Sequence, residues 1–276
     1  MHLAVTARSP VCLIIGDPVS HSLSPVIHNA GYKAAGLPHI MVGAAVSSSD
    51  LEAALQGFRA LRFRGLAVTM PHKKAIVHLL DAVDTVAAEI GAVNTVVNEG
   101  GRLIGYNTDW HGMLRPLERV TTLASKRVAV LGAGGVAQAA VFATTKRGAQ
   151  VTVFNRTSEK AAELAERWGC EHKGLDELSL VPSFEIIINC TSIGMGPPFT
   201  DSPLASDLLA KHHIVFETIY SPHTTALVTH AEARGAQVIR GSEMFLEQAL
   251  AQFELHTGTV APRNTMERAL RGAIEG

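Results

Sequence analysis

The segment RVAVLGAGGVAQAA, which begins at Arg127, constrains the fold more than any other part of the chain. Its first five residues have the character of a buried strand, glycines follow at once, and an alanine-rich helical stretch comes next. This order is typical of a βαβ unit that binds a dinucleotide. The first glycine permits a sharp bend, and the next lets a pyrophosphate approach the positive end of the helix. The sequence therefore predicts that a cofactor lies against Gly132, Ala133, Gly134, Gly135, Val136 and Ala137.

The glycine spacing is more compact than G-x-G-x-x-G, and a tight turn without a ligand is the alternative. The residues after the second strand distinguish between two nicotinamide cofactors. Enzymes that use NAD place Asp or Glu there, about 20 residues on, to bind the ribose 2′-hydroxyl. This chain has Asn155, Arg156 and Thr157 at that place, with Lys160 close behind. A guanidinium fork suits a 2′-phosphate, so the sequence favours NADP, with a solvated surface Arg156 as the alternative.

Strand and helix patterns alternate along the chain. Apolar runs predict strands at 11–15, 41–46, 65–70, 127–131, 151–154, 184–189, 214–217 and 237–239, and a hairpin over 93–105. Helical patterns lie at 24–36, 50–61, 76–80, 86–90, 110–120, 136–146, 158–169, 204–211, 225–234, 242–257 and 265–274. The alternation predicts an α/β fold in two parts, the second of them doubly wound.

Composition narrows the function classes. The 276 residues carry a net charge of −1 without a basic stripe, which argues against a nucleic-acid partner. The apolar runs are too short for a secretory signal or a membrane helix. Cys12, Cys170 and Cys190 are widely spaced, which argues against a disulfide framework. No zinc signature occurs, and the adjacent His212 and His213 do not suit one ligand site, so no metal is predicted. We expect an enzyme of the reducing cytoplasm that acts on a small molecule.

Two serines in the stretch HSLSPVIHNA raise a question of their own, because one serine suffices to cap a helix. Ser24 and Pro25 predict a helix start, with the serine at the N-cap and the proline in the first turn. This interpretation leaves Ser22 without a capping function.

Lys73 and Asp109 are candidates for proton transfer. Lys73 follows a strand and a proline turn in AVTMPHK, and Asp109 follows the hairpin in YNTD. Both lie at strand ends, where functional residues of α/β domains gather. An ordinary lysine is protonated at neutral pH and is a poor base, although a Lys–Asp pair could pass a proton as a unit. Spacing alone does not separate this hypothesis from a surface ion pair of little consequence.

Several motifs occur in an order that is highly specific as a set. They are Ser22–Pro25, Val68–Lys73, Gly91–Thr95, Gly105–Asp109, Gly132–Ala137, Asn155–Thr157, Asn189–Met195, Tyr220–Pro222 and Gly241–Met244 with Gln248. In these motifs the chain resembles the shikimate dehydrogenases over essentially its whole length. The later motifs also resemble the dehydrogenase half of the fused dehydratase–dehydrogenase of plants.

The resemblance implies roles for individual residues. Lys73 matches the catalytic lysine of the family and Asp109 its partner. The residues that match the substrate-binding positions are Ser22, Ser24 and Tyr220 for the carboxylate, and Thr69, Asn94 and Gln248 for the ring hydroxyls. Thr191, Thr218 and Gly241 match positions beside the nicotinamide and its ribose.

The resemblance also implies two domains with the active site in a cleft between them. A substrate domain of residues 1–109 plus 242–276 would enclose an inserted Rossmann-type NADP domain of residues 110–241, in a monomer or a homodimer. Ala67, Glu217 and Thr218 depart from the usual Asn, Asp and Met of the family. Ala67 bears on the rigidity of the loop that carries Lys73. None of the three departures removes a residue with a catalytic role.

Two alternatives remain open at this point. A quinate or aminoshikimate dehydrogenase would use the same scaffold, although a quinate enzyme is expected to widen the Ser-x-Ser pair by one substitution. A non-catalytic NADP-binding sensor is the alternative from another class, and it would be expected to have lost Lys73 or Asp109. Both serines, the lysine and the aspartate are present.

Overall fold

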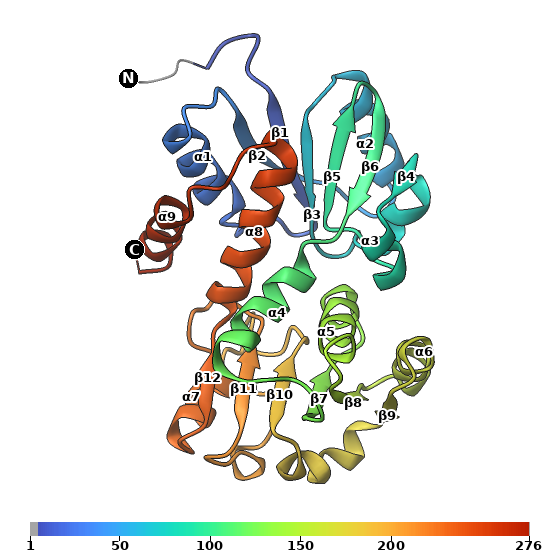
Figure 1. Ribbon diagram of the computed structural model, residues 1–276, viewed down its shortest axis with the longest axis vertical. Helices are drawn as coiled ribbons and strands as arrows, with labels where there is room; N and C mark the ends of the chain where they lie inside the picture. The colour runs from blue at the N-terminus through green and yellow to red at the C-terminus, as the bar shows by residue number, and fades with distance from the viewer. Residues whose placement is uncertain (1–4, 276) are drawn as a thin grey trace. The chain divides into compact units, whose positions relative to one another are not determined.

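The chain forms two compact units, each with its own six-stranded sheet (Figure 1). The computed structural model describes residues 5–275. Unit 1 combines the N-terminal segment up to Thr108 with the C-terminal segment from Leu246, and unit 2 runs from Asp109 to Phe245. Unit 2 is therefore continuous in sequence, whereas unit 1 is built from two separate segments. Within residues 5–275, no helix has both the length and the apolar character that a membrane crossing requires.

Unit 2 is built around a parallel sheet in the order β12-β11-β10-β7-β8-β9. Its strands are β7 (Arg127–Leu131), β8 (Gln150–Phe154), β9 (Glu171–Lys173), β10 (Ile186–Asn189), β11 (Ile214–Glu217) and β12 (Gln237–Ile239). Strands β8 and β9 lie on one side of β7, and β10, β11 and β12 lie on the other. The order of the strands therefore reverses between β7 and β10. This order is that of a Rossmann-type doubly wound sheet, in which ligands bind beyond the carboxyl ends of the strands at the reversal.

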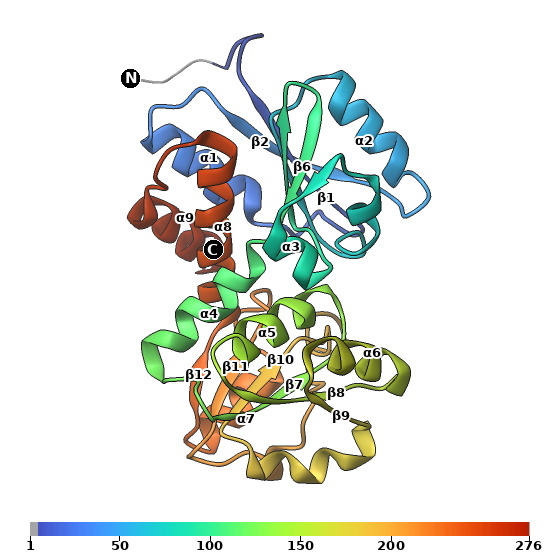
Figure 2. The same cartoon turned by 45° about the vertical axis from the view of Figure 1, so that its right-hand side comes forward.

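Both faces of this sheet are covered, which explains why its inner strands β7, β8, β10 and β11 are mostly apolar. Val128 and Val130 of β7 belong to one core with α4 (Asp109–Val120), α5 (Gly135–Thr145) and α6 (Ser158–Trp168). Ala129 and Leu131 belong to a second core with α7 (Ala226–Ala233) and the 3-10 segments η2 (Leu175–Ser183) and η3 (Ser206–Leu208). Figure 2 shows α5 and α6 on the same face of the sheet. The predicted α/β fold with a Rossmann-type half is therefore confirmed.

Unit 1 contains a mixed sheet in the order β2-β1-β3-β5-β6-β4. Its strands are β1 (Val11–Gly16), β2 (Ile40–Ala45), β3 (Gly65–Val68), β4 (Ala82–Val83), β5 (Thr95–Glu99) and β6 (Arg102–Tyr106). The first three are parallel, and β5 runs antiparallel to both β3 and β6. One core of this unit joins the sheet to α2 (Leu51–Ala60), the 3-10 segment η1 (Ala75–Leu79) and α3 (Thr85–Ile90).

The two segments of unit 1 are held together by helix packing. Gly31 of α1 (Ser24–Ala34) lies so close to α8 (Gly241–Thr257) and α9 (Arg263–Glu275) that a Cβ atom there would meet Phe253 and Met266 at 3.0 Å. Gly65 of β3 likewise faces the ring of His256, and a Cβ atom there would overlap it. The N-terminal sheet and the C-terminal helices therefore share one close-packed interior.

Two fully buried histidines lie in this interior. His28 packs against Tyr32, Phe253 and His256, with ring centroids 5.9 to 6.4 Å away. Burial lowers the pKa of His28 to about 4, because a low-dielectric interior disfavours the imidazolium. Burial also lowers the pKa of His256 well below its ordinary value, and the positive charge of Arg64 adds to the effect. No sequence motif predicted this cluster.

Some predicted elements were wrong in kind or extent. The helix predicted at 204–211 is only the short 3-10 segment η3, because Leu204 and Leu209 both enter the core and a spacing of five does not keep them on one helical face. The helix predicted at 76–80 is the 3-10 segment η1. Strands β4 and β9 were missed, since each lies at a sheet edge and is too short or too polar to show an alternating pattern.

Candidate cofactor and substrate site

The glycine turn of unit 2 has the geometry that a pyrophosphate requires. Gly132 directly follows β7 and has φ of +105°, a conformation that L side chains rarely adopt. A Cβ atom there would also lie 3.1 Å from the carbonyl oxygen of Cys190. Gly134, at the N-cap of α5, faces open space where a side chain would otherwise project. The turn thus leaves bare backbone at the positive end of α5, beside the β7–β10 reversal, which fits a dinucleotide.

The residues predicted to select NADP lie between β8 and α6. The side-chain amide of Asn155 donates to the carbonyl oxygen of Thr157 at 2.9 Å and so shapes the loop. Thr157 is the N-cap of α6. Arg156 and Lys160 are both exposed. Two cations therefore lie on the exposed side of the loop that follows the second strand of the Rossmann sheet, where a 2′-phosphate would be expected.

A buried polar cluster supports the loops after β10 and β11. The carboxylate of Glu217 accepts hydrogen bonds from the Asn189 amide at 2.9 Å, the Thr225 hydroxyl at 2.8 Å and the Ile219 N–H at 3.1 Å. The Asn189 oxygen in turn accepts from the backbone N–H and the hydroxyl of Thr191, at 3.0 and 2.8 Å. Burial raises the pKa of Glu217, and these hydrogen bonds act in the opposite direction. The acid that departs from the family pattern is thus fully hydrogen-bonded, and it fixes the Thr191 loop through Asn189.

Thr218, Gly241 and Tyr220 lie near the same end of the sheet. A Cβ atom on Gly241 would overlap the carbonyl of Ile219 and lie 2.8 Å from that of Thr218, so only glycine fits there. The Thr218 N–H donates to the Asn189 carbonyl at 3.3 Å. Tyr220 packs on Phe245 with ring centroids 4.4 Å apart. The structure therefore gathers Thr191, Thr218 and Gly241 around the ends of β10 and β11.

In unit 1, the loop that carries Lys73 is tightly held despite the alanine at position 67. The Lys73 carbonyl accepts from the Val93 N–H at 2.8 Å, and the Thr69 N–H donates to the Ile15 carbonyl at 2.9 Å. His72 is 1% exposed, and its ring nitrogen donates to the Val46 carbonyl at 2.8 Å. This buried histidine therefore supports the loop that carries Lys73.

Asn94 and Gln248 lie together although 154 positions separate them in the sequence. The Asn94 amide nitrogen is 3.5 Å from the Gln248 side-chain oxygen and 2.9 Å from the Thr108 hydroxyl. Asn94 precedes β5, Gln248 lies on α8, and all three residues are buried. The structure thus brings two of the predicted substrate residues into contact. It adds Thr108, which the sequence analysis included in a motif without a role.

The position predicted for Ser24, at the N-cap of the helix, was wrong. The N-cap of α1 is Leu23, and no side chain caps the helix in the usual way. Instead, the Ser22 hydroxyl accepts a hydrogen bond from the backbone N–H of Ser24 at 3.3 Å. The Ser24 N–H is one of the donors that a helix start leaves unpaired, and a hydroxyl two residues earlier is well placed to reach it. Ser22 is partly exposed and supports the turn, whereas Ser24 is buried as the first helical residue.

Asp109 is buried and stands at the start of α4 in unit 2, whereas Lys73 belongs to unit 1. Their pairing therefore stays a prediction. Next to Asp109, Trp110 contacts Phe142 within unit 2 at a centroid distance of 5.8 Å.

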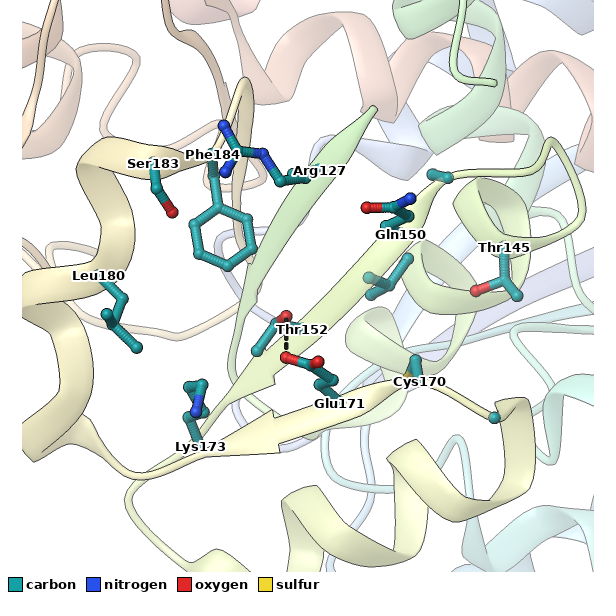
Figure 3. Close-up of a pocket in the computed structure, with 13 residues that line it drawn as sticks. Arg127, Thr145, Gln150, Thr152, Cys170, Glu171, Lys173, Leu180, Ser183 and Phe184 are labelled. Atoms are coloured by element: carbon teal, nitrogen blue, oxygen red, sulfur yellow. Dashed lines mark hydrogen bonds between the residues drawn. The ribbon is translucent and has the colours of Figure 1, made fainter. Parts of the chain in front are cut away.

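Unit 2 also contains a cavity of about 480 Å³, shown in Figure 3. Its lining includes Arg127, Gln150 and Glu171, which begin β7, β8 and β9. Thr152 and Glu171 approach one another inside it at 3.5 Å. The cavity therefore lies at the amino ends of the strands, opposite the end at which doubly wound sheets bind their ligands, and none of the predicted site residues lines it.

The fold and the glycine turn together define an α/β protein with a dinucleotide-binding half. Comparisons with known proteins give the same result. Residues 14–96 match the shikimate dehydrogenase substrate binding domain, residues 116–195 the shikimate / quinate 5-dehydrogenase family, and residues 241–271 the shikimate 5′-dehydrogenase C-terminal domain. A shikimate dehydrogenase (NADP(+)) of Moorella thermoacetica is 43% identical over 283 residues, which cover 99% of this chain and 96% of the relative.

Solved structures agree. A crystal structure of a shikimate dehydrogenase in complex with NADP+ matches with a TM-score of 0.93 at 35% identity, covering 98% of both chains. The Thermus thermophilus shikimate 5-dehydrogenase in complex with NADP(H) and shikimate matches with a TM-score of 0.89 at 34% identity, covering 96% of this chain and 99% of that one. The chain belongs to the shikimate dehydrogenase family, and the family predicted from the motifs is confirmed.

Proposed function

We propose that the chain is an NADP-dependent shikimate dehydrogenase that interconverts 3-dehydroshikimate and shikimate. The match to the family across both units carries this proposal, and the bare glycine turn at the β7–β10 reversal supports it. When bound, NADPH would supply the hydride that reduces the C3 carbonyl. Gly132 to Ala137 would hold the pyrophosphate, and Arg156 with Lys160 the 2′-phosphate. Thr191, Thr218 and Gly241 would lie beside the nicotinamide and its ribose.

The residues of the chain would then bind the substrate and move the proton. We assign Ser22, Ser24 and Tyr220 to the substrate carboxylate, and Thr69, Asn94 and Gln248 to its hydroxyls. The Lys73 ammonium group donates a proton to the carbonyl oxygen during reduction, and the Asp109 carboxylate balances its charge. In the reverse direction the Lys73 amine accepts that proton. The held Lys73 loop suits this role, because proton transfer requires a fixed donor.

A steady-state assay tests the proposal directly. The purified protein is offered shikimate or quinate, each with NADP or NAD, and kcat/KM is measured for the four pairs. We expect shikimate with NADP to give the highest value. Equal or better turnover of quinate would assign the chain to the quinate enzymes of the family, and no turnover of either acid with either cofactor would contradict a dehydrogenase.

Arg156 should decide the choice of cofactor. We expect Arg156→Ala to raise KM for NADP about 10- to 100-fold and to leave KM for NAD nearly unchanged, because a charge-assisted hydrogen bond to phosphate is lost. The matched control is Arg167→Ala, which removes an exposed arginine at the other end of α6. An equal loss of affinity for both cofactors would show that Arg156 does not contact the 2′-phosphate.

Ser22 should contribute to binding far more than to folding. We expect Ser22→Ala to raise KM for shikimate at least tenfold, because a hydrogen bond to a carboxylate is lost, and to lower thermal stability only slightly. Among the described residues, an alanine removes the 3.3 Å hydrogen bond from the Ser24 N–H to the Ser22 hydroxyl. Ser20→Ala, at an exposed serine two positions earlier, is the control. A lowered melting temperature with unchanged KM would make Ser22 a purely structural residue.

The remaining expectations are also proposals. A cytoplasmic location is supported by the three free cysteines, Cys12, Cys170 and Cys190, which suit a reducing compartment. A monomer or a homodimer is proposed for the assembly, and sedimentation would distinguish them.

A further inference from the structure

The side-chain amide of Asn94 is held by a chain of hydrogen bonds that reaches α8. Its oxygen accepts from the backbone N–H of Thr108 at 2.7 Å and from the hydroxyl of Thr95 at 2.8 Å. The Thr95 hydroxyl oxygen in turn accepts from the Gln252 amide at 2.9 Å. The same amide nitrogen lies 3.2 Å from the backbone carbonyl of Asn94. All four residues are buried in unit 1, and Thr95 is fully inaccessible.

These contacts leave only one orientation for the Asn94 amide. A backbone N–H can only donate, so the atom of Asn94 that faces the Thr108 N–H must be the oxygen. The amide nitrogen then faces the Thr108 hydroxyl and the Gln248 side-chain oxygen. A reversed amide would place its oxygen against the oxygen of Gln248 and its nitrogen against an N–H donor, and both contacts would be repulsive.

The Thr95 hydroxyl is oriented in the same way. Because Gln252 donates to the hydroxyl oxygen, the hydroxyl proton is directed toward the second partner, which is the Asn94 oxygen. Gln252 therefore acts on Asn94 twice, through Thr95 and through the Asn94 backbone carbonyl. Such a chain is cooperative, since each bond orients the donor of the next.

We propose that Thr95 and Gln252 are positioning residues for the substrate, which fix the orientation of the Asn94 side-chain amide at which a substrate hydroxyl binds. The proposal rests on the proposed function, in which Asn94 and Gln248 bind the substrate ring. Neither Thr95 nor Gln252 is itself assigned a contact with substrate. Thr95 belongs to the Gly91–Thr95 motif, which assigned it no role, and Gln252 lies outside the motifs.

The first test uses two substitutions of Thr95. Thr95→Val keeps the shape and removes the hydroxyl, and we expect it to raise KM for shikimate about tenfold while KM for NADP stays within about twofold. Thr95→Ser restores the hydroxyl, and we expect it to return KM for shikimate to within about twofold of the original. A purely structural residue would not give this split between the two KM values or this rescue.

The control for burial is Thr144→Val. Thr144 is also fully buried, but its hydroxyl bonds the Ala140 carbonyl within α5 of unit 2. We expect this variant to lose stability without any change in KM for shikimate. If Thr95→Val lowers the melting temperature to the same degree and leaves KM for shikimate unchanged, the proposal is overturned.

A double-variant cycle tests the connection to Gln252. Gln252→Met removes the amide and keeps the length, and we expect it to raise KM for shikimate about three- to tenfold. Combined with Thr95→Val, it should add little, because both substitutions break the same chain. Fully multiplicative effects would refute the chain. The original protein in the same assay separates the two proposals, since its failure to oxidise shikimate would overturn the proposed function and not the geometry of the chain.

Discussion

Lys73→Met should lower kcat for shikimate oxidation by a factor of about 10² to 10⁴ while the dissociation constant for NADPH stays within about twofold. This range is what a positioned acid or base typically contributes to a proton transfer. Asp109→Asn should lower kcat in the same direction, because the carboxylate that balances the lysine charge is lost. Stopped-flow turnover and the fluorescence of bound NADPH measure the two quantities.

The neighbouring Lys74 provides the matched control. It is an exposed lysine one position further along the same loop, so Lys74→Met changes charge and length identically. We expect this variant to keep kcat within about twofold. Near-normal turnover in Lys73→Met, or an equal loss in Lys74→Met, would remove Lys73 from the chemistry. A loss of NADPH binding along with kcat would instead indicate a folding defect.

The second large effect is a loss of stability in acid. In the folded protein burial lowers the pKa of His28 to about 4, whereas an exposed histidine of the unfolded chain titrates near 6.5. Between these values the unfolded state binds more protons, so the free energy of unfolding falls as the pH falls. The contribution is fully present above pH 6.5, and about 3 kcal/mol of it is lost by pH 4. His256 changes stability in the same direction.

Urea unfolding followed by circular dichroism from pH 7.5 to pH 4 measures this slope. His28→Phe keeps an aromatic ring against Phe253 and removes the titration, so its stability should fall less steeply with acid. His78→Gln, at an exposed histidine of η1, should leave the slope unchanged. An identical slope in the original protein and in His28→Phe would show that the His28 ring reaches water before the protein unfolds.

Local sequence was sufficient for the Rossmann half. The run from Arg127 to Ala140 contains a strand, a bend that needs glycine and a helix start, and each is encoded within a few residues. The edge strands β4 and β9 were missed because their formation depends on a neighbouring strand and not on their own pattern. The helix at 204–211 was predicted from a local helical pattern, yet the core positions of Leu204 and Leu209 determine the structure of that segment.

The candidate site shows the same limit. Motifs identified Asn94 and Gln248 separately, but only the fold shows that the Asn94 amide meets Gln248 on α8 and that Gln252, 158 positions away, bonds the Asn94 backbone carbonyl. The sequence also did not show which serine hydroxyl bonds the start of α1, since either could accept from a free backbone N–H there. The structure decides for Ser22, whose hydroxyl accepts from the Ser24 N–H at 3.3 Å. The buried pair His28 and His256 gave no signal, because histidine is neither clearly polar nor clearly apolar in a pattern.

The division of unit 1 into two segments has a consequence for the order of events during synthesis. Unit 2 is complete in sequence once Phe245 has been made, so it can fold while the ribosome is still adding residues. Unit 1 is completed later, since α8 and α9 pack against the face of α1 around Gly31. That face of α1 therefore stays uncovered until α8 and α9 have been made. That interval is when a chaperone would be most needed.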